Sequence, residues 1–205
     1  PQFWRAPTDN DFGNRMGILC NVWRTAGQNK EFKGMNVERK DGAVTLTSIY
    51  YLRDVASDYT VKYTVYADGR VEVNGSWKAG NIALPEIPRF GMQMTLAQEF
   101  DQFSWYGRGP WENYSDRNTA SFIGKYTSAV DEQYVAYIRP QENGNKTDVR
   151  WLTLTNKEGF GLRIDGLQPL SVSALRNYPE DFDAGLTKSQ RHINDINPRK
   201  AVVLH

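Results

Sequence analysis

The sequence predicts an all-β fold, and three observations indicate it. Phe, Trp and Tyr make up 13% of the 205 residues, and such side chains fit the pleated, half-buried surface of a sheet. Three stretches alternate apolar and polar residues with a period of two, and each turns through a Gly-containing segment into a similar stretch. Helical spacing is confined to short stretches. We therefore expect antiparallel sheets with one buried face each.

Three hairpins follow from this alternation. Their strands are Met35–Arg39 with Val44–Tyr50, Thr60–Tyr66 with a return strand from Val71, and Trp151–Thr155 with Phe160–Ile164. The turns of the first two contain Asp-Gly, which is a strong short-range hairpin signal. In the second hairpin, one face of the outgoing strand carries Val61, Tyr63 and Val65. We expect that face to be buried.

One short helix is predicted near the N-terminus, within Asn14–Ala26. Its apolar residues at helical spacing are Ile18, Leu19, Val22 and Trp23. Gly27 is a suitable residue to end it. A further helical turn is predicted within Pro179–Leu186. The long polar stretches at 4–14, 106–118 and 138–148 are predicted to be loops, and loops of this length are usually functional or docked against another surface.

The composition excludes several classes of function. The 25 basic and 24 acidic residues give a formal net charge of +1, without the clustered cationic surface that nucleic-acid binding requires. No stretch approaches the ~20 apolar residues of a membrane span, and the first residues lack the pattern of a signal peptide. A single Cys cannot form a disulfide within the chain. Neither a nucleic acid nor a membrane is therefore an expected partner, and the cellular compartment stays open.

The first polar loop reads WRAPTDNDFG and carries Asp9, Asn10 and Asp11 in a row before Gly13. A calcium loop needs alternating oxygen ligands that are closed by a later bidentate Glu, and this spacing is absent. The residue types favour a turn that leads into the predicted helix, with Asp or Asn as its N-cap.

The second polar loop, WYGRGPWENYSDR, offers both signs of charge. Glu112 with Asp116 would suit the paired carboxylates of a glycosidase. However, Arg108 and Arg117 lie close in sequence, and Arg–carboxylate forks are a common way to rigidify a loop. A general acid needs a raised pKa, whereas a neighbouring Arg lowers the pKa of a carboxyl group. We therefore predict a structural role for this loop.

The third polar loop, RPQENGNKTDVRW, begins at Arg139. Glu142-Asn143-Gly144 is a turn sequence, and Pro140 ahead of it fixes the entry of the chain. Glu142 and Asn143 also have the carboxylate and amide groups that bind sugar hydroxyls. The residues alone leave both interpretations open.

No other pattern nominates a catalyst or a metal site. Cys20 falls on the apolar side of the predicted helix, which favours a place in the core over a role as nucleophile. His192 and His205 are far apart and lack partners at metal-ligand spacing. No G-x-S-x-G, P-loop or G-x-G-x-x-G motif occurs. We expect no catalytic residue, metal or cofactor in this chain.

Taken in order, the three loop motifs resemble the C-terminal small-chain domain of β-galactosidases of the lactose-operon type. PQFWRAPTDNDFG resembles the opening motif of that family, GRGPWENYSDR its central motif, and RPQENGNKTDVRW the motif that follows. The stretch from Gln190 to Asp195 resembles a later, weaker motif. The resemblance spans the chain from end to end.

The resemblance implies a supersandwich fold like that of galactose mutarotase, with two large antiparallel sheets packed face to face and residues 1–205 in a single domain. It implies a parent enzyme that hydrolyses terminal β-galactosides with retention of configuration. The two catalytic Glu residues of that enzyme would lie on a separate, preceding (β/α)8 barrel. The Mg and Na ions of the family also belong mainly to the barrel.

The resemblance also implies places for the loop residues. The segment that faces the mouth of the substrate pocket would contain Asp9, Asn10, Asp11 and Gly13. The other two motifs carry over only as characteristic loops, without an assigned role. Their residues are Arg108, Glu112, Asn113, Asp116, Arg117, Arg139, Glu142 and Asn143.

The sequence departs from the family at its C-terminal end. The family's domain usually continues through a Gly-Gly-Asp-x-Ser-Trp motif whose Trp helps to form the sugar subsite. This chain ends at His205 without that motif, and it starts in mid-pattern without an initiator Met. We expect a domain that is truncated at its C-terminal end, without its final strands and that Trp.

Three functions are compatible with the sequence. The first is a non-catalytic accessory domain that packs on the catalytic barrel of its parent β-galactosidase, shapes the galactoside pocket and supports contacts in a homo-oligomer. The substrate would then bind only in the assembled enzyme. The second is an independent carbohydrate-binding module, which needs an exposed row of rings such as Trp105, Tyr106 and Trp111. The third is a mutarotase-type enzyme, whose acid–base pair would be His192 with a Glu. The ordered motifs favour the first.

Overall fold

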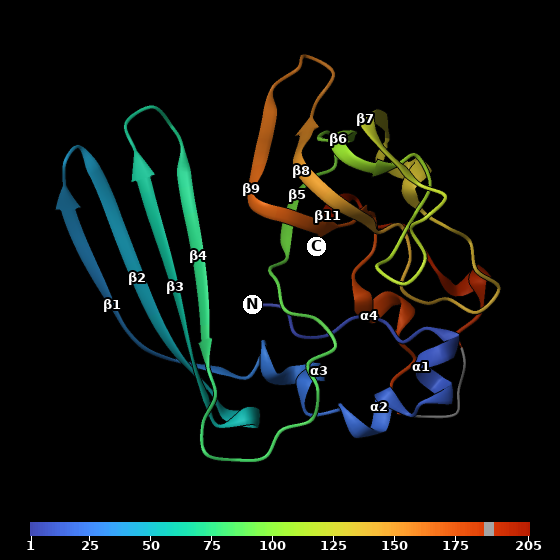
Figure 1. Cartoon of the computed structure of the whole chain (residues 1–205), viewed down its shortest axis with the longest axis horizontal. Helices are drawn as coiled ribbons and strands as arrows, with labels where there is room; N and C mark the ends of the chain where they lie inside the picture. The colour runs from blue at the N-terminus through green and yellow to red at the C-terminus, as the bar shows by residue number, and fades with distance from the viewer. Residues whose placement is uncertain (187–190) are drawn as a thin grey trace. The chain divides into compact units, whose positions relative to one another are not determined.

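The computed structural model describes residues 1–186 and 191–205, and it has the predicted all-β fold. Three antiparallel sheets are accompanied by short helices (Figure 1). The chain forms two compact units, of which unit 1 is Pro1–Arg5 with Arg15–Gly91 and unit 2 is Ala6–Asn14 with Met92–His205. The single-domain assignment stays a prediction. No helix in the described ranges is long and apolar enough to span a membrane.

Unit 1 is built on a four-stranded antiparallel meander. Its strands are, in sheet order, β1 (Lys30–Lys40), β2 (Ala43–Leu52), β3 (Ser57–Tyr66) and β4 (Val71–Lys78). A 3₁₀ turn, η1 (Arg53–Val55), joins β2 to β3. In the first turn Asp41 and Gly42 have φ values of 51° and 76°, and two positive φ values in a two-residue hairpin loop are typical of a type I′ turn. The first two predicted hairpins are confirmed.

The apolar face of this sheet is buried only in part. Tyr59 and Val61 are buried, whereas Val65, Val71 and Val73 near the hairpin tips are exposed. The predicted buried face is therefore confirmed near Tyr59 and wrong at the tips. The core cluster at the buried end contains Phe3, Trp4, Met16, Trp23, Ala26, Leu52, Val55, Tyr59 and Val61.

The single helix that was expected within Asn14–Ala26 is instead two short helices, and a third precedes them. The three are α1 (Asp9–Gly13), α2 (Met16–Leu19) and α3 (Trp23–Ala26). Arg15 has a φ of 64°, and this left-handed conformation interrupts any continuous helix between α1 and α2. Gly27 is the C-cap of α3 as predicted. Ile18 and Leu19 are exposed, so the predicted apolar face does not form there.

Unit 2 contains the other two sheets. The four-stranded sheet has the order β7-β6-β8-β9 and comprises β6 (Gln102–Gly109), β7 (Phe122–Ala129), β8 (Lys146–Thr155) and β9 (Gly161–Val172). The three-stranded sheet comprises β5 (Met94–Ala97), β10 (Ala174–Leu175) and β11 (Ala201–Leu204). The helical segments after β7 are η2 (Val130–Gln133), α4 (Pro179–Phe182) and η3 (Ile193–Asp195). The third predicted hairpin is β8–β9, and α4 is the helical turn predicted within Pro179–Leu186.

The core of unit 2 lies on one face of the four-stranded sheet. Burial alternates strictly along β6, so Phe103 and Trp105 are buried and their rings stack with centroids 4.8 Å apart. The cluster also contains Val130, Val149, Leu152, Leu154, Val172, Ala174, Val202 and Leu204. Because β6 and β8 are antiparallel neighbours, the C-terminal end of β6 and the N-terminal end of β8 lie at the same end of the sheet. The loops after β6 and before β8 therefore emerge together.

Candidate functional site

Residues of all three predicted loop motifs converge in unit 2. The second motif follows β6, the third leads into β8, and the first forms α1, which the third motif contacts directly. The motifs are far apart in sequence. The second and third come together because β6 and β8 pair in the sheet. The resulting cluster of polar side chains is the candidate site, and it is called the loop cluster below.

Asn113 is a fully buried side chain of the loop cluster. Its Oδ1 accepts hydrogen bonds from the backbone N–H of Thr147 at 2.8 Å and from Oγ1 of Thr147 at 2.6 Å. Its Nδ2 donates to the carbonyl of Trp111 at 3.0 Å. The backbone carbonyl of Asn113 accepts from Nδ2 of Asn145 at 2.8 Å. Asn113 therefore joins the second motif to the first residues of β8.

Glu112 makes the second link between these loops. One oxygen accepts a hydrogen bond from Arg117 at 3.0 Å and another from the hydroxyl of Tyr137. The other oxygen accepts from the backbone N–H of Gly144 at 2.8 Å. Burial raises the pKa of the Tyr137 hydroxyl, and its hydrogen bond to Glu112 raises it further. The Arg–carboxylate pair predicted for this loop is therefore Arg117 with Glu112.

Lys146 is a buried cation at the start of β8, with 2% of its surface exposed. Its Nζ donates a hydrogen bond to the carbonyl of Gly144 at 3.1 Å and lies 5.2 Å from the ring centroid of Trp105. Burial lowers the pKa of the Lys146 ammonium to about 8, and the Glu112 carboxylate opposes that shift. Because isolated buried charges are costly, this lysine bears directly on stability.

Tyr114 adds a buried hydroxyl to the loop cluster. Its oxygen has no hydrogen-bond partner among the described residues. The Arg117 guanidinium lies over its ring, 4.3 Å from the centroid. Burial raises the pKa of the Tyr114 hydroxyl strongly, and the carboxylates of Glu142 and Glu112 raise it further.

The helix α1 is held by the third motif. Nε2 of Gln141 donates to Oδ2 of Asp9 at 3.2 Å, and Oε1 of Gln141 accepts from the N–H of Asp9 at 3.3 Å. The Arg139 guanidinium lies 3.3 Å from the ring centroid of Phe12 and 3.8 Å from Oδ1 of Asp9. Asn10 is exposed in the same helix. These contacts anchor α1 at Asp9 and Phe12 and leave Asn10 exposed.

The N-cap of α1 differs from the prediction. Thr8 is the cap, and the carboxylate of Asp11 accepts from the N–H and the hydroxyl of Thr8 at 2.8 and 2.9 Å. This reciprocal arrangement is a capping box, in which an acidic or amide residue at the third helical position bonds back to the cap. Asp11 is therefore buried, whereas Asp9 and Gly13 are exposed.

The remaining motif residues do not form a carboxylate pair. Arg108 donates to the carboxylate of Asp148 at 2.5 Å and to the carbonyl of Ser121 at 2.8 Å. Asp116 is exposed and has no hydrogen bond or ion pair among residues 1–186 and 191–205. Glu112 is engaged as described above, so the geometry favours the structural interpretation of this loop.

The third motif is buried at Glu142 and Asn143, the two residues for which the sequence left two interpretations open. Glu142 is 5% exposed and Asn143 is 1% exposed. Oδ1 of Asn143 accepts from the N–H of Val135 at 3.1 Å, and its Nδ2 donates to the carbonyl of Gln141 at 2.9 Å. Asn143 therefore bonds its own loop, which favours the turn interpretation over direct contact with sugar hydroxyls.

Sequence reasoning missed four contributors to the loop cluster, namely Tyr114, Tyr137, Gln141 and Lys146. Three of them lie inside the quoted motifs, where a polar or aromatic side chain among glycines and prolines gave no hint of burial. Tyr137 lies just ahead of the third motif, and nothing in its local sequence distinguishes it.

The three rings named for a carbohydrate-binding module do not form an exposed row in the described part of the chain. Trp105 is 1% exposed and belongs to the core, and Tyr106 is half-buried on the opposite face of β6. Trp111 is 73% exposed, so one ring of the predicted three is fully available.

The other candidate residues do not gather into a site. Among the described residues, no group of three or more His, Cys, Asp or Glu side chains could hold a metal ion. Cys20 is half-buried and packs against the unit 1 core, as predicted. His192 precedes η3 at the surface. Of the weaker fourth motif, Gln190 lies outside the described residues.

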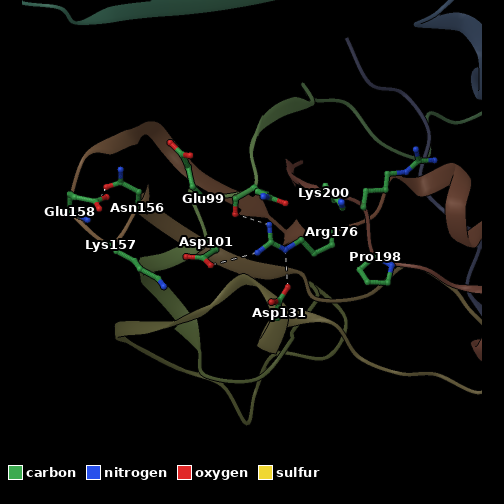
Figure 2. Close-up of a pocket in the computed structure, with 11 residues that line it drawn as sticks. Glu99, Asp101, Asp131, Asn156, Lys157, Glu158, Arg176, Pro198 and Lys200 are labelled. Carbon is green, nitrogen blue, oxygen red and sulfur yellow. Dashed lines mark hydrogen bonds and ion pairs between the residues drawn. The ribbon is translucent and has the colours of Figure 1, made fainter.

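A separate polar pocket of about 780 Å³ lies in unit 2 (Figure 2). Charged or amide side chains line it throughout except at Pro198. At its centre, Arg176 bonds to the carboxylate of Asp131 at 2.8 Å and the carbonyl of Gln98 at 2.9 Å, and it lies 3.7 Å from the carboxylate of Asp101. Arg176 therefore ties three segments of unit 2 together.

Replacing Arg176 with Met is expected to lower the free energy of unfolding by about 1 kcal/mol, because the Asp131 carboxylate and the carbonyls of Gln98 and Ala201 lose a charged donor. The Arg176 side chain is 12% exposed, so water cannot fully replace it. Chemical denaturation followed by tryptophan fluorescence measures the change. The exposed Arg39→Met is the matched control, and an equal loss in both variants would contradict the role of Arg176.

Comparison with known proteins identifies the same group of proteins as the motifs do. The family model described as "Beta galactosidase small chain" matches residues 1–205. The β-galactosidase of Priestia megaterium is 41% identical over 184 residues, which cover 90% of this chain and 18% of that protein. The β-galactosidase of Lactobacillus delbrueckii subsp. bulgaricus is 35% identical over 207 residues, which cover 98% of this chain and 20% of that protein. The chain thus spans about a fifth of the length of these relatives.

Proposed function

Because this chain belongs to the β-galactosidase small-chain family, we propose that it is a non-catalytic accessory domain of a retaining β-galactosidase. It packs on the catalytic barrel of the parent chain and shapes one side of the galactoside pocket. The two catalytic Glu residues, together with the Mg and Na ions, belong to that barrel. The parent enzyme is a homo-oligomer, and this chain alone is inactive.

The observation that carries this proposal is that the Glu112 carboxylate in the loop cluster binds neighbouring protein groups. Glu112 accepts hydrogen bonds from Arg117, Tyr137 and Gly144, so its carboxylate is committed to holding the loops. A retaining glycosidase needs two carboxyl groups ~5 Å apart that both reach the substrate. Asp116 is exposed and is not paired with Glu112 in the described part of the chain. The loop cluster is suited to shaping a surface.

The exposed residues of α1 support a place at the edge of a pocket. Asp9, Asn10 and Gly13 are exposed, while Gln141 and Arg139 anchor the helix through Asp9 and Phe12. Exposed carboxylate and amide groups on a fixed backbone are suited to contact sugar hydroxyls or a neighbouring domain. The carbohydrate-binding module lacks its aromatic row, and no observation favours a mutarotase with His192 as its acid or base.

The test is a paired assay of the purified 205-residue chain. We expect no hydrolysis of a chromogenic β-galactoside and no heat of binding with galactose or lactose. Turnover would overturn the assignment of the catalyst to another domain. Binding without turnover would favour the carbohydrate-binding module, and anomer interconversion that is lost in His192→Ala would favour the mutarotase.

A further inference from the structure

We propose that Glu112 is a positioning residue, which sets where α1 lies by holding the loop formed by residues 141–146. The inference rests on the proposed function, because it assumes that α1 borders the galactoside pocket. Glu112 would thus act on a helix outside its own loop.

The first step is a clamp on the peptide groups of Gly144. Glu112 accepts the N–H of Gly144 at 2.8 Å, and Lys146 donates to the carbonyl of the same residue at 3.1 Å. Gly144 has a φ of +74°, and a Cβ at this position would lie 2.9 Å from the carbonyl oxygen of Gln133. The turn therefore fits only glycine, and its position is fixed from both sides.

The second step leads from Gly144 to α1. Asn143 donates to the carbonyl of Gln141 at 2.9 Å and accepts from the N–H of Val135, which fixes the loop around Gln141. Gln141 then bonds both the N–H and the carboxylate of Asp9. Glu112 and Asp9 are thus linked within unit 2 by the hydrogen bonds at Gly144 and Gln141 and by the short stretch of backbone between these two residues.

The helix α1 is too short to be stable without tertiary contacts. The helix has five residues, and a helix this short is not stable without tertiary contacts because nucleation is unfavourable. Its position therefore depends on tertiary contacts, among them those from Gln141 and Arg139. A shift of the 141–146 loop would move the exposed Asp9 and Asn10 with it.

A carboxylate suits this place better than a neutral side chain does. Three donors point at Glu112, from Arg117, Tyr137 and Gly144, and an ionised carboxylate accepts all three with two oxygens. The Glu112 side chain is 10% exposed, so water does not replace these acceptors easily. Gln in its place would turn an NH₂ group toward donors.

The experiment is a double-mutant cycle in the parent β-galactosidase. Glu112→Ala and Gln141→Ala are made singly and together, with Glu112→Gln as the milder variant should Glu112→Ala fold poorly. Asp116→Ala is the matched control, since this carboxylate lies in the same loop without a partner among the described residues. We measure kcat and KM on a chromogenic β-galactoside, well below the melting temperature of each variant.

We expect Glu112→Ala and Gln141→Ala each to raise KM ~10-fold with little change in kcat, because both remove positioned contacts to bound substrate. The double variant should be no worse than the poorer single variant, since both changes act through Asp9. Glu112→Gln should lie between, and Asp116→Ala should match the wild type. A merely structural role would lower the amount of active enzyme and leave KM unchanged.

Failure of this inference and failure of the proposed function are distinguishable. If Asp9→Ala and Gln141→Ala raise KM while both Glu112 variants leave it unchanged, α1 borders the pocket and Glu112 does not position it. Additive effects of Glu112→Ala and Gln141→Ala would also overturn the positioning role. If Asp9→Ala itself leaves KM unchanged, α1 does not border the pocket, and the assumption taken from the proposed function fails as well.

Discussion

Replacing Asn113 with Ala is expected to lower the free energy of unfolding by about 3 kcal/mol, because buried donors and acceptors lose their partners. The side chain of Asn113 is fully buried. Its removal leaves the N–H and hydroxyl of Thr147 without their shared acceptor, and the carbonyl of Trp111 without its donor. Chemical denaturation followed by tryptophan fluorescence measures the change.

Two further variants serve as a comparison and a control for Asn113→Ala. Asn113→Asp keeps an acceptor for Thr147 but places a carboxylate oxygen against the carbonyl of Trp111 in a buried site, so it should also be destabilising. Asn118→Ala is the matched control in the same loop, because the Asn118 side chain makes no hydrogen bond in the described ranges of the chain. Its effect should stay within about 0.5 kcal/mol. Equal losses in Asn113→Ala and Asn118→Ala would contradict the role assigned to Asn113.

The hairpins could be predicted from the sequence because their signals are local. The Asp41-Gly42 turn supplies the two positive φ values that its two-residue loop needs, and alternation in the flanking strands selects the register. The same reasoning could not say how far each face is buried. Val65 and Tyr59 share one face of β3, and only Tyr59 is covered by the core of unit 1.

The loop cluster could not be predicted in the same way because its contacts are long-range. Glu112 and Gly144 are 32 residues apart, and Gln141 and Asp9 are 132 residues apart. No local sequence pattern predicts contacts between residues so far apart in the sequence. The pairing of β6 with β8 creates the first contact, and that pairing depends on the whole sheet. Lys146 shows the limit most clearly, since a lysine between polar residues predicts exposure.

Individual residues were interpreted correctly when the argument concerned neighbouring charges. The proximity of Arg117 to Glu112 predicted an ion pair in place of a catalytic acid, and the two side chains are 3.0 Å apart. Arg108 also forms an ion pair with a carboxylate, but its partner, Asp148, comes from β8 and lies outside the loop. The motif resemblance identified the family, while the physical reading of the residues explained why the loops need those residue types.

The free energy of unfolding of the wild type is expected to rise between pH 8 and pH 10, and replacing Lys146 with Met is expected to remove this rise. Burial lowers the pKa of the Lys146 ammonium from 10.5 to about 8 in the folded chain. Between these values the unfolded state binds more protons than the folded state, so the free energy of unfolding rises with pH. Below pH 8 both states are protonated, and the folded state bears the full cost of the buried charge. Relative to Lys146→Met, the wild type should gain about 2 kcal/mol between pH 8 and pH 10.

The measurement is the difference in free energy of unfolding between wild type and Lys146→Met at several pH values. The difference is used because Tyr114, whose pKa is raised by burial, changes stability in the opposite direction once the unfolded tyrosine ionises, and this effect cancels between the two proteins. Lys125→Met, at an exposed position of β7, should show a constant difference. A constant difference for Lys146→Met would mean that the ammonium keeps its solution pKa in the folded chain. The attraction of the Glu112 carboxylate would then fully offset the burial of the ammonium.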